Sequence, residues 1–319
     1  MKKITLLSFA VAMIMASCQK NNLTDDENTS PILHRNCASQ EVLEAQIKAD
    51  PELEQRMSNF EKIIENNIKN NASARLVNGV IEIPVVVNVL YKSTAQNIST
   101  TQIQSQIDVL NEDFNATNAD SYKVPSNFQN VKANVGIRFV LDKVVRKKTS
   151  KTSWSTNDAM KKSSSGGISA TTPTTKLNIW VCNLSGGVLG YAQFPGGASS
   201  TDGVVILSTA FGRVGTASAP FNKGRTATHE VGHWLNLRHI WGDATCGSDL
   251  VSDTPTHNTA NYGCPAASHK STCSGTPLEM WINFMDYTDD ACMYMFSNGQ
   301  KSRVLATFAS GGPRASFAQ

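Results

Sequence analysis

The sequence has no long hydrophobic segment, no concentrated basic region and no internal repeat. Beyond an apolar run at residues 4–16, no segment approaches the roughly 20 residues that a transmembrane helix requires. The formal net charge is only +3 over 319 residues, and basic residues form short clusters such as 143–151. We therefore predict no nucleic-acid partner and no spanning helix, and we expect a soluble chain attached only through its N-terminus.

The first residues form an export signal. Met1-Lys2-Lys3 is followed by the apolar run, which is too short to span a membrane and is typical of a signal peptide. The run ends in Met15-Ala16-Ser17-Cys18, which resembles the lipobox of bacterial lipoproteins. The resemblance implies a signal peptide at 1–17 and a lipid on Cys18; the alternative is a plain secretory signal with an incidental cysteine. Both predict export, and the first predicts a membrane-anchored lipoprotein of the cell envelope or surface.

The next segment has the composition of a tether followed by a helical region. Residues 19–30 are polar, whereas residues 39–70 carry apolar side chains at helical spacing: Leu53, Met57, Phe60, Ile64 and Ile68. Asp50 is a candidate cap, and Pro51 suits the first helical position. The small, polar stretch before Arg75 indicates a boundary. We assign 18–75 to a tether and prosegment and 76–319 to a catalytic domain.

The remaining chain alternates strand and helix patterns, which predicts an α+β fold with a mixed sheet. Ser99, with Gln102 three residues later, forms a capping box before an amphipathic stretch. A final helix is expected around 300–308. The predicted strands are Ile81–Tyr91, Val135–Leu141, Leu177–Cys182 and Val204–Ser208.

Residues 229–239 read HEVGHWLNLRH and predict a catalytic zinc site. On a helix, His229 and His233 project side by side and can share one zinc ion. His239 completes the site if the chain turns back, and Asn236 stands where that turn belongs. Three histidines leave the fourth position for water, whose proton Glu230 can accept without being a ligand. The alternative is a chance motif on a solvated helix, but three of the six histidines fall in this window.

This motif resembles the metzincin signature HExxHxxGxxH, from which it departs by Asn236 in place of glycine. Asn is the residue besides Gly that most readily adopts the left-handed conformation of such a turn. The resemblance implies that Met285 is the methionine beneath the zinc ligands and that Tyr287 stabilises the transition-state oxyanion. The alternative is that Met285 and Tyr287 are ordinary buried side chains.

From about Ile81 to the C-terminus, the sequence around the motif resembles the pappalysin family, especially its ulilysin-like members. Besides HEVGHW, the matching stretches are SDTP at 252–255 and MDYTDDACM at 285–293. The resemblance implies a metzincin-like domain with a twisted mixed sheet, an active-site helix and an irregular C-terminal subdomain containing the Met-turn. It also implies two disulfides, Cys246 with Cys273 and Cys264 with Cys292, although the sequence alone allows three pairings.

The family resemblance also implies cleavage on the N-terminal side of Arg or Lys. Asp290 matches the acidic residue of the pocket, where a carboxylate would bind a guanidinium. Alternatively, Asp289-Asp290 is a solvated turn or helix cap, or Asp289 is the residue that points inward. An exposed edge strand around Gly203–Phe211 is expected to hold the substrate by strand addition.

The family further implies a structural calcium ion near the disulfide-bonded loop. Asp243, Asp249 and Asp253 lie in the matching stretch, and we assign the calcium to Asp249 and Asp253. Alternatively, these acids only form hydrogen bonds within turns.

Cys37, within the sequence HRNCAS, is a candidate latency residue. A prosegment thiolate could occupy the fourth zinc position, which resembles the cysteine switch of metzincin precursors. The alternatives are a free or disulfide-bonded cysteine. Removal of the prosegment requires a cut between Ala74 and Leu76, which this enzyme could make itself and which would release it from the lipid.

We predict a secreted, self-processing zinc endopeptidase that is monomeric and acts on proteins or peptides. The rivals are a surface lipoprotein that binds another protein through a vestigial zinc site and a zinc hydrolase acting on another substrate. Glu230 argues against the binding module, which has no need for that carboxylate.

Overall fold

The protein is represented by a computed structural model that describes residues 34–72 and 80–317. The predicted signal peptide, Cys18 and the expected processing site around Arg75 lie outside the described residues. Within the described part of the chain, no helix is both long and apolar enough to cross a membrane.

Two helices precede the first strand, one helix separates the first two strands, and the last three strands follow with no α-helix between them before the final two helices. The α-helices are α1 (Ser39–Ala49), α2 (Glu52–Lys69), α3 (Thr100–Phe114), α4 (Arg225–Trp234) and α5 (Asn298–Phe308). The strands are β1 (Ile81–Tyr91), β2 (Ile137–Lys148), β3 (Leu177–Cys182), β4 (Gly190–Ala192) and β5 (Val204–Leu207). Short 3₁₀ turns cover Ser121–Lys123, Ser126–Val131, Ala159–Lys161, Ser163–Ser165, Ser199–Thr201, Ser208–Ala210, Asp290–Cys292 and Ala315–Phe317.

The strands form one five-stranded mixed sheet in the order β2-β1-β3-β5-β4. All neighbouring pairs are parallel except β4 and β5, which are antiparallel. The predicted α+β class is therefore confirmed. Pro84 fits within β1 because it pairs with β2 only, and the pairing of β1 with β3 begins at Val85.

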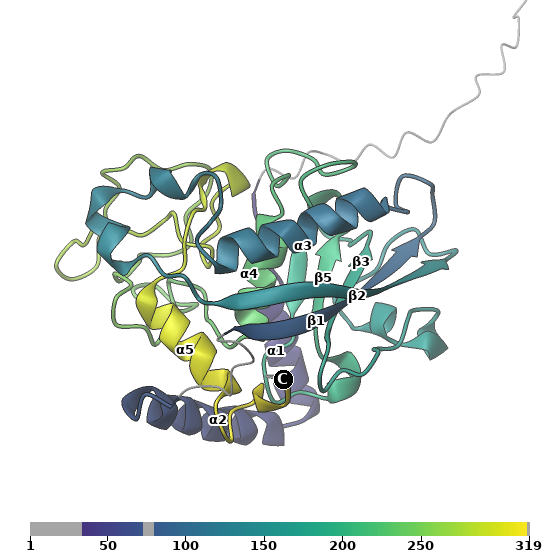
Figure 1. Ribbon diagram of the computed structural model, residues 1–319, viewed down its shortest axis with the longest axis horizontal. Helices are drawn as coiled ribbons and strands as arrows, with labels where there is room; N and C mark the ends of the chain where they lie inside the picture. The colour runs from purple at the N-terminus through teal and green to yellow at the C-terminus, as the bar shows by residue number, and fades with distance from the viewer. Residues whose placement is uncertain (1–33, 73–79, 318–319) are drawn as a thin grey trace, which may run out of the picture. The chain divides into compact units, whose positions relative to one another are not determined.

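Alternate strand residues contribute to two separate cores. One face of the sheet packs against α3 and α4, which lie over it in Figure 1; Val87 and Ile179 belong to this core together with Ile107 and Val231. The opposite face carries Trp180 and Val205 and is covered by irregular segments. The active-site helix is therefore fixed against the first face.

The structure corrects one prediction about the strands and adds a strand that was not predicted. The expected substrate-binding edge at Gly203–Phe211 is wrong, because β5 is an internal strand between β3 and β4. The edge strand next to β5 is β4, which the sequence analysis missed: it has only three residues and begins with a glycine. Such a strand is too short to show an alternating pattern.

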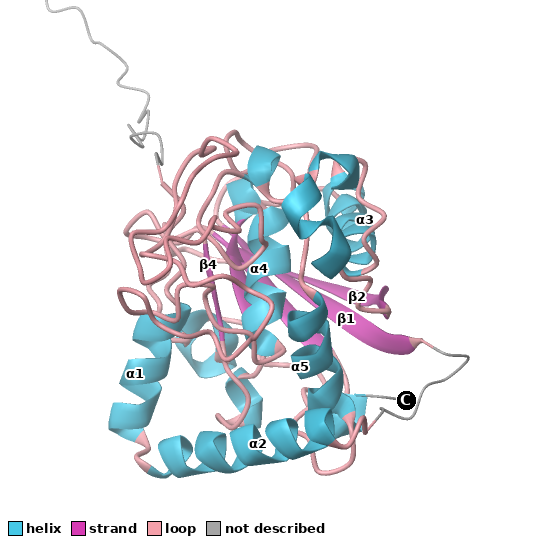
Figure 2. Cartoon of the chain, turned by 90° about the vertical axis from the view of Figure 1, so that its left-hand side faces the viewer, coloured by secondary structure: helices cyan, strands magenta, loops and turns pink. Residues whose placement is uncertain are grey.

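The helical region at 39–70 consists of two helices that meet at Asp50-Pro51. The Asp50 side chain, at the start of α2, forms an ion pair with Arg56. Figure 2 shows α2 lying across the ends of α1 and α5. Glu61 of α2 forms an ion pair with Arg303 of α5 at 2.7 Å, so α2 is anchored to the last helix of the chain.

The C-terminal part between α4 and α5 is irregular and contains both disulfides that the family resemblance implies. Cys246 is bonded to Cys273 and Cys264 to Cys292. These bonds join loops that have little regular hydrogen bonding of their own. Cys37 and Cys182 are free and buried.

Candidate functional site

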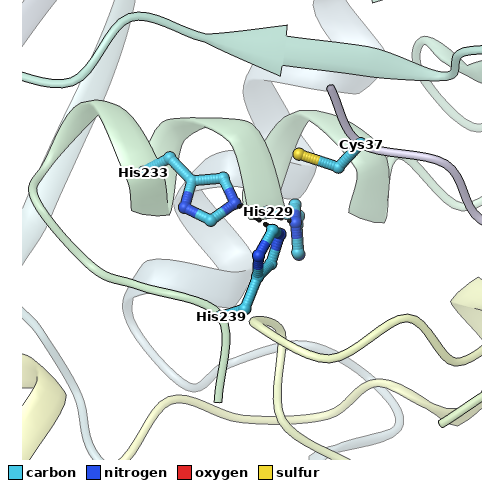
Figure 3. A group of neighbouring side chains, drawn as sticks. All are labelled: Cys37, His229, His233 and His239. Atoms are coloured by element: carbon cyan, nitrogen blue, oxygen red, sulfur yellow. Dashed lines mark hydrogen bonds between the residues drawn. The ribbon is translucent and has the colours of Figure 1, made fainter. Parts of the chain in front are cut away.

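The three predicted histidine ligands converge at the C-terminal end of α4 (Figure 3). The Nε2 atom of His233 lies 3.1 Å from Nε2 of His229 and 3.0 Å from Nε2 of His239. Two ligands at 2.0–2.1 Å from a tetrahedral zinc are separated by about 3.3 Å. The spacing of the three nitrogen atoms is therefore close to that of a tetrahedral metal site.

A tight helix end brings His239 to the other two histidines. The amide of Leu237 donates to the carbonyl of Gly232, and the amide of Asn236 donates to the carbonyl of His233. This is the Schellman pattern, in which the residue after the cap is left-handed. Asn236 has a φ of 68°, as predicted from its replacement of glycine.

Each imidazole is oriented through its Nδ1 atom. The acceptors are the Phe284 carbonyl for His229 at 2.7 Å, the Leu237 carbonyl for His233 at 2.8 Å and the Asp243 carboxylate for His239. Because a carbonyl can only accept, Nδ1 of His229 and His233 carries the proton and the Nε2 lone pair faces the cluster. Partners of this kind fix the orientation of metal ligands.

The electrostatics of the cluster fit a cation. Burial, reinforced by His239, lowers the pKa of His233 to about 3, and burial lowers the pKa of His229 well below its usual value. His229 and His233 are therefore neutral, and their Nε2 lone pairs face the cluster. A metal ion in the cluster would be coordinated by these lone pairs, and the donor set suits zinc.

Cys37 provides a fourth donor. Its Sγ and the three histidine nitrogens all lie within 4.8 Å of one another, and all four residues are buried (Figure 3). Burial and the neighbouring Glu230 carboxylate raise the pKa of the Cys37 thiol well above its usual value. A thiolate at this position therefore requires a cation beside it.

Glu230 points toward the thiol and not toward solvent. Its Oε2 accepts from the Cys37 Sγ at 3.3 Å and from the Ser39 hydroxyl at 2.9 Å. Burial raises the pKa of Glu230 to about 7, although these hydrogen bonds lower it. A β-carbon at Gly190 of β4 would lie about 3.0 Å from the Glu230 side chain, so the glycine makes room for the carboxylate.

Met285 packs against α4, and Tyr287 lies beside the histidine cluster. Met285 is fully buried, and a β-carbon at Gly232 would overlap its sulfur, so the methionine packs directly beneath α4. The Tyr287 hydroxyl donates to the Cys37 carbonyl at 3.0 Å, and its ring lies 4.9 Å from that of His239. The tyrosine can therefore reach a carbonyl oxygen at the metal site.

Asp290 is fully buried and binds Arg35 of the prosegment. Its Oδ1 accepts from the Arg35 guanidinium at 2.6 Å, and its Oδ2 accepts from the amides of Lys223 and Arg225 at 2.7 and 3.2 Å. The guanidinium also donates to Thr226 and to the Thr288 carbonyl. Asp290 is therefore a buried carboxylate that binds a guanidinium and also the first amide of α4, and it is not a solvated turn, whereas Asp289 is only half-buried.

The two acids assigned to calcium differ in their contacts. Asp253 accepts from the Ser297 hydroxyl and the Gly299 amide at the start of α5, as expected for a residue that stabilises a helix end. The Asp249 carboxylate and the Val251 carbonyl instead crowd around the Thr254 hydroxyl at 2.9–3.1 Å. One hydroxyl proton cannot satisfy three acceptors.

The sequence analysis missed several residues of the site. Asp243 was considered only as a calcium ligand, and the roles of Ser39 and Arg35 were not recognised. Arg35 carried a usable signal, since an arginine close to the proposed zinc-binding cysteine matches the expected preference for basic residues. No sequence signal pointed to Ser39 or to the Phe284 carbonyl, because their positions depend on contacts between distant segments.

Comparison with known proteins agrees with this site. Residues 169–309 match the peptidase M43 family, described as pregnancy-associated plasma protein-A. Extracellular metalloproteases of Arthroderma benhamiae and Coccidioides posadasii are 32% and 34% identical over 247 and 238 residues. These alignments cover 74% and 70% of this chain and 80% and 75% of the relatives.

Two solved structures share the fold. Mature mirolysin of Tannerella forsythia, in complex with a cleaved peptide, has a TM-score of 0.73 and 46% identity, covering 75% of this chain and 96% of that one. A promirolysin variant of the same organism has a TM-score of 0.80 and 43% identity, covering 89% and 97%. The chain therefore belongs to the pappalysin family of metzincins and is a zinc metalloendopeptidase.

Proposed function

We propose that this endopeptidase is exported as a latent precursor and cleaves proteins on the N-terminal side of Arg or Lys. The observation that carries the specificity is the ion pair between Arg35 and Asp290, which is buried next to the histidine cluster. A buried carboxylate with one oxygen already bound by two backbone amides presents its other oxygen to a cationic side chain. A substrate with a neutral side chain in this position would leave the buried Asp290 charge without a partner.

Each site residue has a defined part in hydrolysis. His229, His233 and His239 would hold the zinc ion, which when bound polarises the substrate carbonyl and acidifies the attacking water. Glu230 accepts the proton of that water and transfers it to the leaving amine. The Tyr287 hydroxyl donates a hydrogen bond to the carbonyl oxygen as negative charge develops on it.

The prosegment indicates how a substrate would lie. Residues 36–38 pair with the edge strand β4 in the parallel direction, through hydrogen bonds from Leu189 to Asn36 and from Ala38 to Gly190. Cys37 lies at the histidines, and Arg35, which precedes it, lies in the pocket. A substrate cut before its basic residue runs the opposite way, from zinc to pocket, and would pair antiparallel with β4.

Latency follows from the same contacts. The thiol occupies the donor position that the attacking water requires, Ser39 and Cys37 engage Glu230, and Arg35 fills the specificity pocket. Because the prosegment runs opposite to a substrate, its own peptide bonds are not presented for cleavage. The domain assignment of 18–75 and 76–319, with processing between Ala74 and Leu76, remains part of this proposal.

Replacing Cys37 by alanine is expected to weaken latency. In an Arg75→Gln precursor that keeps its prosegment attached, Cys37→Ala is expected to raise peptide hydrolysis about tenfold or more, because the fourth zinc position becomes open to water. Cys182→Ala, at the other free cysteine, is the matched control and should remain latent. Equal activity of the two variants, with intact chains verified by mass spectrometry, would show that the thiol does not maintain latency.

Export and anchoring depend on the leader. The relatives named extracellular metalloproteases support export, and the lipobox-like sequence before Cys18 supports a lipid anchor in the precursor. Processing near Arg75 would release the catalytic domain as a monomer. Metabolic labelling with a fatty acid, compared between the natural chain and Cys18→Ala, tests the anchor.

A structural calcium ion is proposed at Asp249, with the Thr254 hydroxyl and the Val251 carbonyl as further oxygen donors. A cation would relieve the crowding of these acceptors. Calcium removal is expected to lower the thermal midpoint by about 5–10 °C, with recovery in CaCl₂ but not in MgCl₂. The response should disappear in Asp249→Asn, and zinc analysis should show that the chelator left the catalytic ion in place.

The function is tested by digestion of a protein mixture with the processed enzyme, mapping every new N-terminus by mass spectrometry. New termini beginning with Arg or Lys, absent after zinc removal and restored by zinc, are expected. Cleavage without basic preference would retain the peptidase and refute the pocket assignment.

A further inference from the structure

Tyr262 is a large side chain that is exposed although its backbone is firmly held. Its side chain is 48% exposed. The neighbouring Asn261 amide donates to Asp286 at 2.8 Å, and the Gly263 carbonyl accepts from the Asp289 amide at 2.9 Å. The Cys264–Cys292 disulfide joins the same two loops. The Tyr262 ring is therefore presented from a rigid support beside the Met-turn.

The ring of Tyr262 contacts the prosegment immediately beyond the specificity pocket. The His34 ring meets it edge-on, with ring centroids 5.1 Å apart and an interplanar angle of 67°. The Tyr262 ring also lies 6.0 Å from the Tyr287 ring, so it adjoins the catalytic centre. Asp289 lies beside this ring, because its amide donates to the carbonyl of Gly263, the residue after Tyr262. The exposed residue next to the buried arginine thus packs one side of its ring against Tyr262.

The position of His34 corresponds to one substrate residue. Counting outward from the histidine cluster, the chain reaches Cys37, then Arg35 in the pocket, then His34 against Tyr262. In a substrate cleaved before a basic residue, the residue after that basic residue lies next outward from the pocket. Adjacent side chains of an extended chain point in opposite directions, as those of Arg35 and His34 must to reach different loops.

We infer that Tyr262, with Asp289 beside it, forms a second specificity subsite for an aromatic or imidazole ring on the residue that follows the basic residue of the substrate. The inference rests on the proposed cleavage before Arg or Lys, whose next residue it specifies. Edge-to-face pairs of rings gain affinity beyond that of buried area alone, which corresponds to a preference of about two- to tenfold. Because Tyr262 is already held in place, little ordering is needed when a ring binds.

The test uses processed enzyme and four quenched peptides that contain one Arg followed by Phe, His, Leu or Ala. We expect kcat/KM to be about two- to tenfold higher for the Phe and His peptides than for the Leu and Ala peptides. Tyr262→Ala is expected to remove this difference while leaving the Ala peptide unchanged, and Tyr262→Phe is expected to retain it. The leucine peptide separates ring recognition from general apolar contact.

The outcomes distinguish the subsite from the pocket. Equal cleavage of all four peptides, or an equal loss on all four in Tyr262→Ala, would overturn the subsite. A second set with Ala in place of Arg examines the pocket separately. If the two sets are cleaved equally well but the ring preference persists and depends on Tyr262, the subsite stands and the proposed basic specificity is refuted.

Discussion

Replacing Glu230 by glutamine is expected to lower kcat/KM of the processed enzyme by about 10²- to 10⁴-fold. Glutamine retains the size and polarity of the side chain but cannot accept the proton of the attacking water. Glu230 is almost fully buried and makes no contact with the histidine Nδ1 atoms, whose acceptors are Phe284, Leu237 and Asp243. The zinc site itself should therefore remain.

The measurement combines peptide hydrolysis with metal analysis of the same preparation. The Glu230→Gln enzyme should contain as much zinc as the natural enzyme, so that the loss arises in the chemical step. Glu82→Gln is a suitable control, because Glu82 forms an exposed ion pair with Arg138 at 3.4 Å and should leave activity unchanged. Near-normal hydrolysis by zinc-loaded Glu230→Gln would assign the proton transfer to another group.

Replacing Asp290 by asparagine is expected to lower kcat/KM for a peptide with Arg after the scissile bond by about 30-fold or more. The substitution removes the charge that faces the guanidinium but keeps an oxygen for the amides of Lys223 and Arg225. A peptide with Ala at that position should be affected little, because it makes no ion pair. The expected result is thus a loss of discrimination and not of catalysis.

Asp289→Asn provides the matched control for this prediction. Asp289 is the adjacent carboxylate but is only half-buried, and the Arg35 guanidinium is paired with Asp290. With peptides whose residue after Arg is alanine, Asp289→Asn should retain most of the preference for Arg. A larger loss in Asp289→Asn than in Asp290→Asn would reverse the assignment. Thermal melting of each variant verifies that the fold is intact.

The precursor supplies an independent check of the same pocket. Arg35 contacts Asp290, Thr226 and the Thr288 carbonyl, and these contacts should help to hold the prosegment in place. Asp290→Asn should therefore weaken latency as well as specificity. If Asp290→Asn changed the specificity of the processed enzyme but left the precursor fully latent, Arg35 would occupy the pocket without contributing to inhibition.

Local patterns in the sequence were sufficient to predict the catalytic motif. The four-residue spacing of His229 and His233 places both on one side of a helix, whatever surrounds it. Asn236 is suited to the left-handed turn because asparagine adopts this backbone conformation more readily than other residues except glycine. Strands β1 and β3 were also found with the correct bounds, since β-branched runs of this length have few alternatives.

Contacts between distant segments were decided by the tertiary structure. The edge position of β4 depends on the order of strands in the sheet, which joins segments far apart in the sequence. The sequence thus determined the chemistry of the zinc site, because that chemistry resides in one short segment. Only the tertiary structure could place Arg35 against Asp290 and His34 against Tyr262, because these contacts join residues more than 200 positions apart.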